Sequence, residues 1–194
     1  RTERPRALEY EYSIAAVPGA DTPALPQGIF VLPGSYTVRL TMDGKTLEQP
    51  LVIEVDPRVH VARETLVEQF RFYSEVVDSL ERATDTRLEI RELRGRVEEL
   101  TRDAAGSDES AGVREKARQL GAELRRFEGG GGEDDIATLA GVLSSLTIDV
   151  ESADGPPTAP QRECHATYTD RLDTAVSRWE TVRENVERQL RPQD

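Results

Sequence analysis

The spacing of apolar residues divides the chain into two parts. From position 36 to position 55 apolar and polar side chains alternate, which is the period of a half-buried β-strand. Asp43-Gly44 interrupts the alternation, and this dipeptide favours the positive φ angles of a type I′ turn. The pattern predicts an antiparallel hairpin, with Pro50 at an edge or a non-pairing position because proline lacks an N–H.

Two further strands are expected before this hairpin. Alternation over Leu8–Ile14 predicts one, and the short apolar run Gly28–Leu32 predicts another, with a proline-containing loop over 17–27 between them. We assign residues 1–58 to an antiparallel β module that resembles the end of an immunoglobulin-like sandwich. Because so short a module is small for a complete sandwich, either the helices that follow cover its exposed face or further strands lie upstream.

From residue 62 onward apolar residues recur every three to four positions, which predicts helices. Four segments with this pattern are separated by polar or glycine-rich breaks: 62–103, 111–128, 133–150 and 159–191. The first and last are long, and the middle two placed end to end match one long helix. The sequence therefore predicts an α+β fold in which a bundle of about four helices, over 62–191, follows the β module.

Local signals refine these helices. Thr84-Asp85-Thr86 is the expected weak point of the first helix, because threonine and aspartate have low helix propensity. Gly129–Gly132 is expected to be a turn between helices, since it lacks the Lys and Ser/Thr that follow the glycines of a phosphate-binding loop. Thr158 and Gln161 have capping-box spacing at the start of the last helix. Trp179 and Tyr168 fall on its apolar stripe and are expected in the core.

The chain is acidic, and this excludes some partners. Of its 194 residues, 37 are Asp or Glu and 25 are Lys or Arg, so the formal net charge is −12. The negative electrostatic field of such a chain disfavours binding to nucleic acid and to anionic membrane surfaces, because both are polyanions. No apolar run is long enough for membrane insertion. Lys45 and Lys116 are the only lysines. Acidity with scarce lysine fits adaptation to concentrated salt, while a GC-rich genome would equally favour arginine.

We find no set of residues with the spacing of a known catalytic or metal site. Cys164 and His165 are adjacent, but neighbours on a helix do not face each other, and Cys164 falls on the apolar stripe. His60 and His165, the two histidines, lack the spacing of zinc ligands. The acidic run Glu133–Asp135 is expected at a helix start, where the helix dipole favours acid. We therefore expect no catalytic residue, no metal site and no cofactor.

Four aromatic residues of the β module are the candidates for an interaction surface. They are Tyr10, Tyr12, Phe30 and Tyr36. If part of the sheet has no cover within the chain, these side chains would form an exposed apolar patch, and such patches mark binding sites.

The hairpin also resembles part of a known family. The segment Val31–Lys45 (VLPGSYTVRLTMDGK), followed by Gln49–Leu51 (QPL) and Asp56–Val59 (DPRV), is similar to the C-terminal region of large bacterial proteins with sortilin-type or BNR (Asp-box) β-propellers, often described as glycosyl hydrolase-like. Trp179 lies where that region has a late tryptophan. The chain lacks the Ser-x-Asp-x-Gly-x-Thr-Trp box of the propeller blades. The resemblance therefore implies an upstream propeller, to which any hydrolase activity would belong, and an extracytoplasmic location.

The chain begins with Arg1 rather than Met, which we interpret as the start of a fragment. Together with the resemblance, this predicts a monomeric, non-catalytic C-terminal accessory region that packs against an upstream domain of the same polypeptide or associates with another protein. A carbohydrate-binding or glycosidase-associated module is one alternative, and it requires exposed aromatic residues on the sheet. Self-association through the helices is the other, and it ranks lower because the apolar stripes can close an internal bundle.

Overall fold

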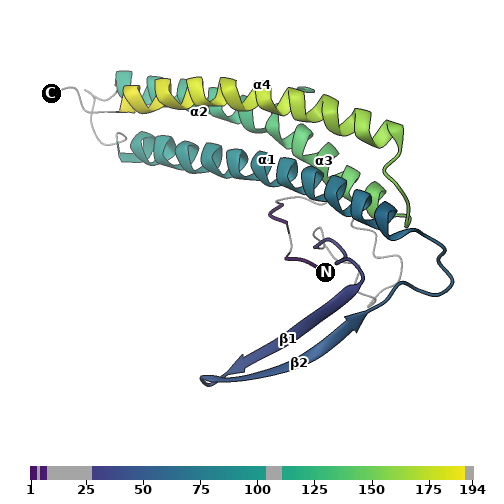
Figure 1. Ribbon diagram of the computed structural model, residues 1–194. Coiled ribbons are helices and arrows are strands. Elements are labelled where there is room, and N and C mark those ends of the chain that lie inside the picture. The colour runs from purple at the N-terminus through teal and green to yellow at the C-terminus, as the bar shows by residue number, and fades with distance from the viewer. Residues whose placement is uncertain (4, 8–27, 104–110, 191–194) are drawn as a thin grey trace, which may run out of the picture.

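The computed structural model describes residues 1–3, 5–7, 28–103 and 111–190. Two strands come first, β1 (Gly34–Met42) and β2 (Lys45–Ile53). Four helices follow: α1 (Arg63–Asp103), α2 (Ala111–Gly129), α3 (Ile136–Glu151) and α4 (Ala159–Leu190). This is the predicted α+β order, a small antiparallel sheet followed by four helices (Figure 1).

The hairpin closes at the expected turn. Asp43 and Gly44 both have positive φ angles, 50° and 73°, as a type I′ turn requires. In a two-residue hairpin, the two residues beside the turn, here Met42 and Lys45, form both backbone hydrogen bonds with each other. Every second pair along the ladder does the same, and the pairs between them form none. Pro50 pairs with Thr37 at one of the intervening positions, so its nitrogen points out of the ladder. The prediction that Pro50 lies at an edge or a non-pairing position is confirmed.

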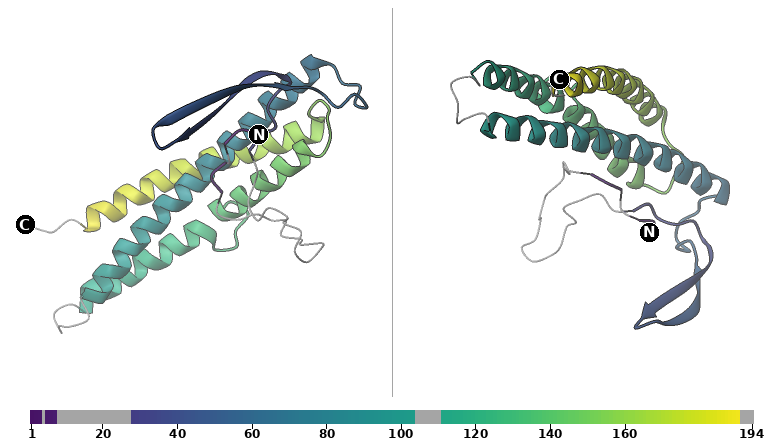
Figure 2. Two further views of the ribbon diagram at one scale, coloured as in Figure 1. Left: turned by 90° about the horizontal axis from the view of Figure 1, so that it is seen from below. Right: turned by 90° about the vertical axis from the view of Figure 1, so that its left-hand side faces the viewer.

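The rest of the β module differs from prediction. The strand expected over Leu8–Ile14 and the loop expected over 17–27 lie outside the described residues. The strand expected over Gly28–Leu32 is wrong, because the segment is irregular and Ile29 bonds to Thr2 instead of to a ladder. No described helix covers the hairpin, which projects from one end of the bundle (Figures 1 and 2).

The bundle is built around α1, which packs against each of the other three helices. Its 41 residues span about 60 Å at 1.5 Å per residue. α2 and α3 follow one another along the length of the bundle beside α1 and α4 (Figures 1 and 2), as their lengths predicted. The expected weak point does not interrupt α1, because Thr84 and Thr86 are buried and the Thr86 hydroxyl donates to the Arg82 carbonyl at 2.9 Å.

The buried apolar side chains form two clusters. The larger runs along the bundle between the helices and includes Leu80, Ile90, Leu93, Leu124, Leu139, Leu143, Leu172 and Trp179. The smaller lies near the hairpin and contains Ile29, Phe72, Tyr73, Val76, Leu146 and Val150. At the start of α1, Phe72 and Val76 are buried, and Phe70 and Val77 are partly covered. There α1 packs against both α3 and the segment that carries Ile29, so a wider arc of the helix is covered.

Caps and glycine set the ends of the shorter helices. Gly131 has a φ of 86°, a conformation that glycine adopts without strain, in the turn after α2. α3 begins at Ile136 rather than at residue 133, because Asp135 is its N-cap and accepts from the Thr138 N–H at 2.7 Å. At the start of α4 the predicted capping box is present: the Thr158 N–H donates to the Gln161 side chain at 2.8 Å.

Candidate functional site

Exposed large hydrophobic side chains gather on the hairpin and its base. Among the described residues they are Phe30, Tyr36, Val38, Leu40, Met42, Leu47, Leu51, Val52, Val55 and Leu88, of which only Leu88 belongs to the bundle. Alternate residues of a strand share a face, and paired residues lie opposite each other. Six of these side chains therefore form one face of the hairpin, which we call the apolar face: Tyr36, Val38, Leu40, Met42, Leu47 and Leu51.

Two of the four predicted interaction residues lie in the described part of the chain. Phe30 is 59% exposed, but the Arg1 guanidinium carbon lies 3.8 Å from its ring centroid. Tyr36 is 36% exposed, and its hydroxyl donates to the Leu32 carbonyl at 2.5 Å. Tyr10 and Tyr12 lie outside the described residues. Tyr36 is thus the one aromatic member of an otherwise aliphatic face.

The two edges of the hairpin are not equivalent. By the alternation of the ladder, Ser35, Thr37, Arg39 and Thr41 of β1 direct their N–H and C=O groups outward. On β2 one of the outward positions is Pro50, which has no N–H to offer. β1 therefore presents the unbroken row of donors and acceptors that an additional strand requires.

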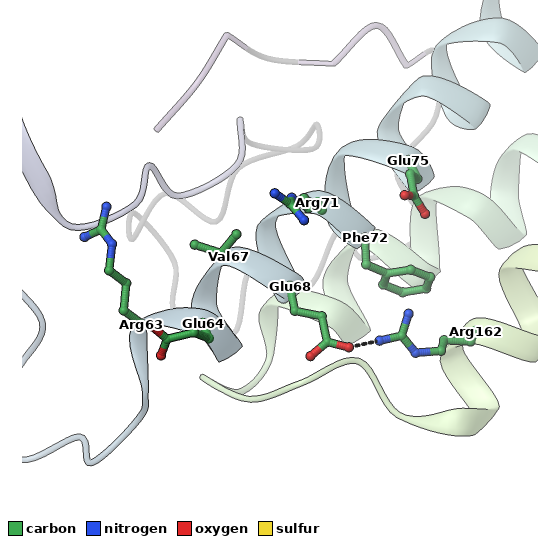
Figure 3. Close-up of a pocket in the computed structure, with 8 residues that line it drawn as sticks. All are labelled: Arg63, Glu64, Val67, Glu68, Arg71, Phe72, Glu75 and Arg162. Atoms are coloured by element: carbon green, nitrogen blue, oxygen red, sulfur yellow. Dashed lines mark hydrogen bonds and ion pairs between the residues drawn. The ribbon is translucent and has the colours of Figure 1, made fainter.

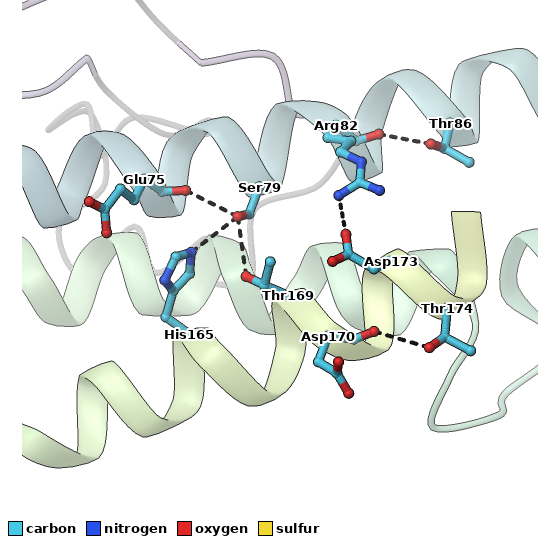
Figure 4. A network of polar contacts seen from close by, with 9 residues as sticks. All are labelled: Glu75, Ser79, Arg82, Thr86, His165, Thr169, Asp170, Asp173 and Thr174. Atoms are coloured by element: carbon cyan, nitrogen blue, oxygen red, sulfur yellow. Dashed lines mark hydrogen bonds and ion pairs between the residues drawn. The ribbon is translucent and has the colours of Figure 1, made fainter. Parts of the chain in front are cut away.

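A polar network joins α1 to α4 (Figure 4). The Ser79 hydroxyl lies 3.1 Å from Nε2 of His165 and 3.3 Å from the Thr169 hydroxyl. The serine donates its proton to the Glu75 carbonyl at 3.1 Å, and no carboxylate in the described part of the chain bonds to His165. A nucleophilic serine needs its proton directed to the base and a third group that orients the base. We interpret Ser79 and His165 as a structural link between helices.

The start of α1 and the start of α4 border an open groove of about 450 Å³ (Figure 3). Three arginines and three glutamates line it, so the formal charges cancel; Arg162 comes from α4, and Arg63, Arg71, Glu64, Glu68 and Glu75 come from α1. Arg162 pairs with Glu68 and lies 5.4 Å from the Phe72 ring centroid. An exposed groove of paired charges has neither the enclosure nor the convergent polar groups of a small-molecule site.

One buried carboxylate is held by several arginines. The Glu128 side chain, 9% exposed, accepts from Nε of Arg91 at 2.5 Å and from Arg94, and its oxygen lies 3.6 Å from Nε of Arg87. Burial by itself raises the pKa of Glu128, but the three guanidinium groups together lower it below its usual value. The cluster ties the end of α2 to the middle of α1 with an ionised carboxylate, and this is a structural role.

The cysteine and the acidic run also have structural partners. Cys164 packs against the smaller core cluster, and burial, aided by the nearby Asp149 carboxylate, raises the pKa of its thiol. A raised pKa keeps the thiol protonated, which disfavours nucleophilic chemistry. In the acidic run, Asp134 accepts from Nε of Arg171 at 2.7 Å. Across the described ranges, no group of three or more His, Cys, Asp and Glu residues is placed to hold a metal ion.

No protein family, curated protein or solved structure matches this chain. None of the helices in the described part of the chain is long and apolar enough to cross a bilayer. The apolar face is therefore the candidate site on its geometry alone. The sequence predicted that the sheet could be exposed, but the links between Ser79 and His165 and between Glu128 and the arginines were missed, because no local pattern marks pairs that meet only in the bundle.

Proposed function

We propose that this chain is a non-catalytic interaction region whose hairpin docks on an adjoining β-domain of the same polypeptide. The observation that carries the proposal is the exposure of the apolar face: Val38, Leu40 and Met42 are 51%, 60% and 68% exposed. An isolated two-stranded hairpin is at best marginally stable in water and needs a further strand or a packed face. An adjoining sheet would supply both, with one strand at the β1 edge and a cover for the apolar face, as in an immunoglobulin-like sandwich.

The chemistry of the face favours a protein occupant over a sugar. Carbohydrate binding on a sheet calls for several exposed aromatic rings, whereas five of the six residues of the apolar face are aliphatic. Self-association through the helices finds little support either, because Leu88 is the one large hydrophobic side chain exposed on the described surface of the bundle. Aliphatic side chains on a two-stranded sheet are suited to interdigitate with the inner face of another sheet.

A tethered partner also suits the size of the face. Stable complexes between separate proteins bury about 800 Å² on each partner, which is more than one face of a single hairpin offers. A domain in the same polypeptide is held at an effective concentration in the millimolar range, so a smaller interface suffices. The resemblance to the C-terminal region of sortilin-type propeller proteins agrees with such an adjoining domain, and in that case any enzymatic activity would belong to the other domain.

Cysteine protection tests this proposal. In a Cys164→Ser background, Leu40→Cys places a thiol on the apolar face, and Arg39→Cys, one residue away on the same strand, places a matched thiol on the opposite face. We compare the 194-residue chain with the full-length polypeptide purified from the cell. In the full-length polypeptide, the Leu40→Cys thiol should react with a maleimide at least about tenfold more slowly, because docking covers the apolar face there. Arg39→Cys should react alike in both. Equal rates for Leu40→Cys in the two proteins would refute the docking.

A further inference from the structure

The base of the hairpin is held by a segment far from it in sequence. We call residues 28–33 the root of the hairpin. The Arg1 side chain reaches three groups there: Nη1 donates to the Gly28 carbonyl at 3.0 Å, the guanidinium stacks on the Phe30 ring, and Nη2 pairs with Glu151. Glu151 ends α3 and also accepts from the Tyr73 hydroxyl of α1 at 3.3 Å. One guanidinium therefore links the root to the end of α3 and, through Glu151, to Tyr73 of α1.

Thr2 adds a backbone link to the same place. Its N–H donates to the Ile29 carbonyl at 2.7 Å, and the Ile29 N–H donates to the Thr2 hydroxyl at 2.8 Å. The side chain of Ile29 is buried in the smaller core cluster. The chain approaches so closely that a Cβ on Gly28 would lie 1.9 Å from the Thr2 carbonyl oxygen, so only glycine fits at this position.

Arg6 fastens the other end of the segment to the bundle. Its N–H donates to the Glu81 carboxylate at 3.0 Å, and its guanidinium Nη1 lies 2.8 Å from the Asp85 carboxylate, both on α1. Pro5 is buried, and Ala7 packs against the larger core cluster. Residues 1–3 and 5–7 thus contact the root at one end and the middle of α1 at the other.

The hairpin itself has few other restraints on its direction. β1 and β2 pack on each other rather than on the helices. Among the described residues, Ile29 of the root packs with Phe72, Tyr73 and Val76 of α1, and Nη1 of Arg63, an exposed donor, bonds to the Pro33 carbonyl at 2.8 Å. The direction of the apolar face therefore depends on how firmly the root is held.

We propose that residues 1–3 and 5–7 are a clasp that holds the root against the bundle and sets the direction in which the apolar face is presented. Within the clasp, the Arg1 guanidinium contacts the Phe30 ring and the Glu151 carboxylate. The Arg6 guanidinium contacts the Glu81 and Asp85 carboxylates, and arginine is well suited to such acidic partners. The inference rests on the proposed docking function for its purpose, since a fixed direction lowers the entropy cost of docking. The contacts themselves are independent of any partner.

Spin labels can test the clasp on the 194-residue chain alone. In a Cys164→Ser background, Lys45→Cys labels the tip of the hairpin and Glu92→Cys labels an exposed position on α1. We expect a narrow distribution of label distances when the clasp is intact, and a broadened or shifted one when Arg1→Gln and Arg6→Gln are combined. Gly28→Ala, which displaces Thr2 by collision, should have the same effect.

A matched control changes the same charge elsewhere. Arg39→Gln with Arg58→Gln also removes two guanidinium groups, together with their ion pairs to Glu48 and Asp56, but leaves the clasp intact. Its distance distribution should equal that of the parent. Amide exchange at Ile29 should rise about tenfold in the clasp variants and not in the control. An unchanged distribution in both clasp variants, with unchanged exchange at Ile29, would overturn the clasp and leave the cysteine test of docking unaffected.

Discussion

The buried Glu128 provides the sharpest test of what holds the bundle together. Replacing Glu128 by Gln keeps its shape but removes the charge that three arginines surround, one of which, Arg87, has a side chain only 8% exposed. Removing one partner of a buried, hydrogen-bonded ion pair costs about 3–5 kcal/mol. Arg94 keeps Glu98 as a second partner at 3.7 Å and Arg91 is more exposed, so we expect a loss near the lower limit, about 3 kcal/mol.

Urea denaturation followed by far-UV circular dichroism measures this loss, with Glu98→Gln as the matched control. Glu98 contacts Arg94 and Arg125 in the same region, but its side chain is 53% exposed, so its removal should cost about 0–1 kcal/mol. If the two variants lose equal stability at neutral pH, the reasoning about burial is wrong.

The pH dependence gives an independent check on Glu128. Its pKa is lowered in the folded protein relative to the ordinary 4.5, so the stabilisation is fully present above that value and is lost as the pH falls through the lower folded pKa. The difference in free energy of unfolding between the parent and Glu128→Gln should therefore be constant near neutral pH and shrink on acidification below about pH 4.5. A difference that stays constant into the acid range would contradict an ionised, paired Glu128.

Two further substitutions separate the bundle from the hairpin. Leu172→Ala opens a cavity in the larger core cluster, where Leu172 is fully buried. It should lower the free energy of unfolding by about 2–5 kcal/mol in the same urea assay. A loss below about 1 kcal/mol would mean that the cluster is loosely packed. Gly44→Ala places a side chain at a φ of 73° in the hairpin turn, a strain of about 1–2 kcal/mol, and should speed amide exchange in β1 and β2 without moving the helix denaturation midpoint. A shift of that midpoint would show that the hairpin is coupled to the bundle.

Most of the secondary structure could be predicted from the sequence because its signals are local. Alternation and Asp43-Gly44 determined the hairpin, and the capping box at Thr158 and the glycines after α2 marked helix ends within a few residues. Backbone dihedral preferences, caps and one-sided burial depend on neighbours in the chain, so a single sequence contains them. The wrong prediction of a strand over Gly28–Leu32 has the opposite cause. Five residues are too few to establish a periodic pattern, and the backbone of Ile29 bonds to Thr2, a residue distant in sequence, instead of to a neighbouring strand.

The tertiary structure decided what the surfaces present. Ser79 meets His165 across 86 positions, Glu128 meets Arg91 across 37, and Thr2 meets Ile29 across 27. Such pairs depend on the rotation and register of whole helices, which a periodic stripe determines only to within a broad arc. The same holds for the candidate site. Alternation in β1 and β2 determined that one face of the hairpin is apolar, but only the direction in which the hairpin leaves the bundle decided that no described helix covers it.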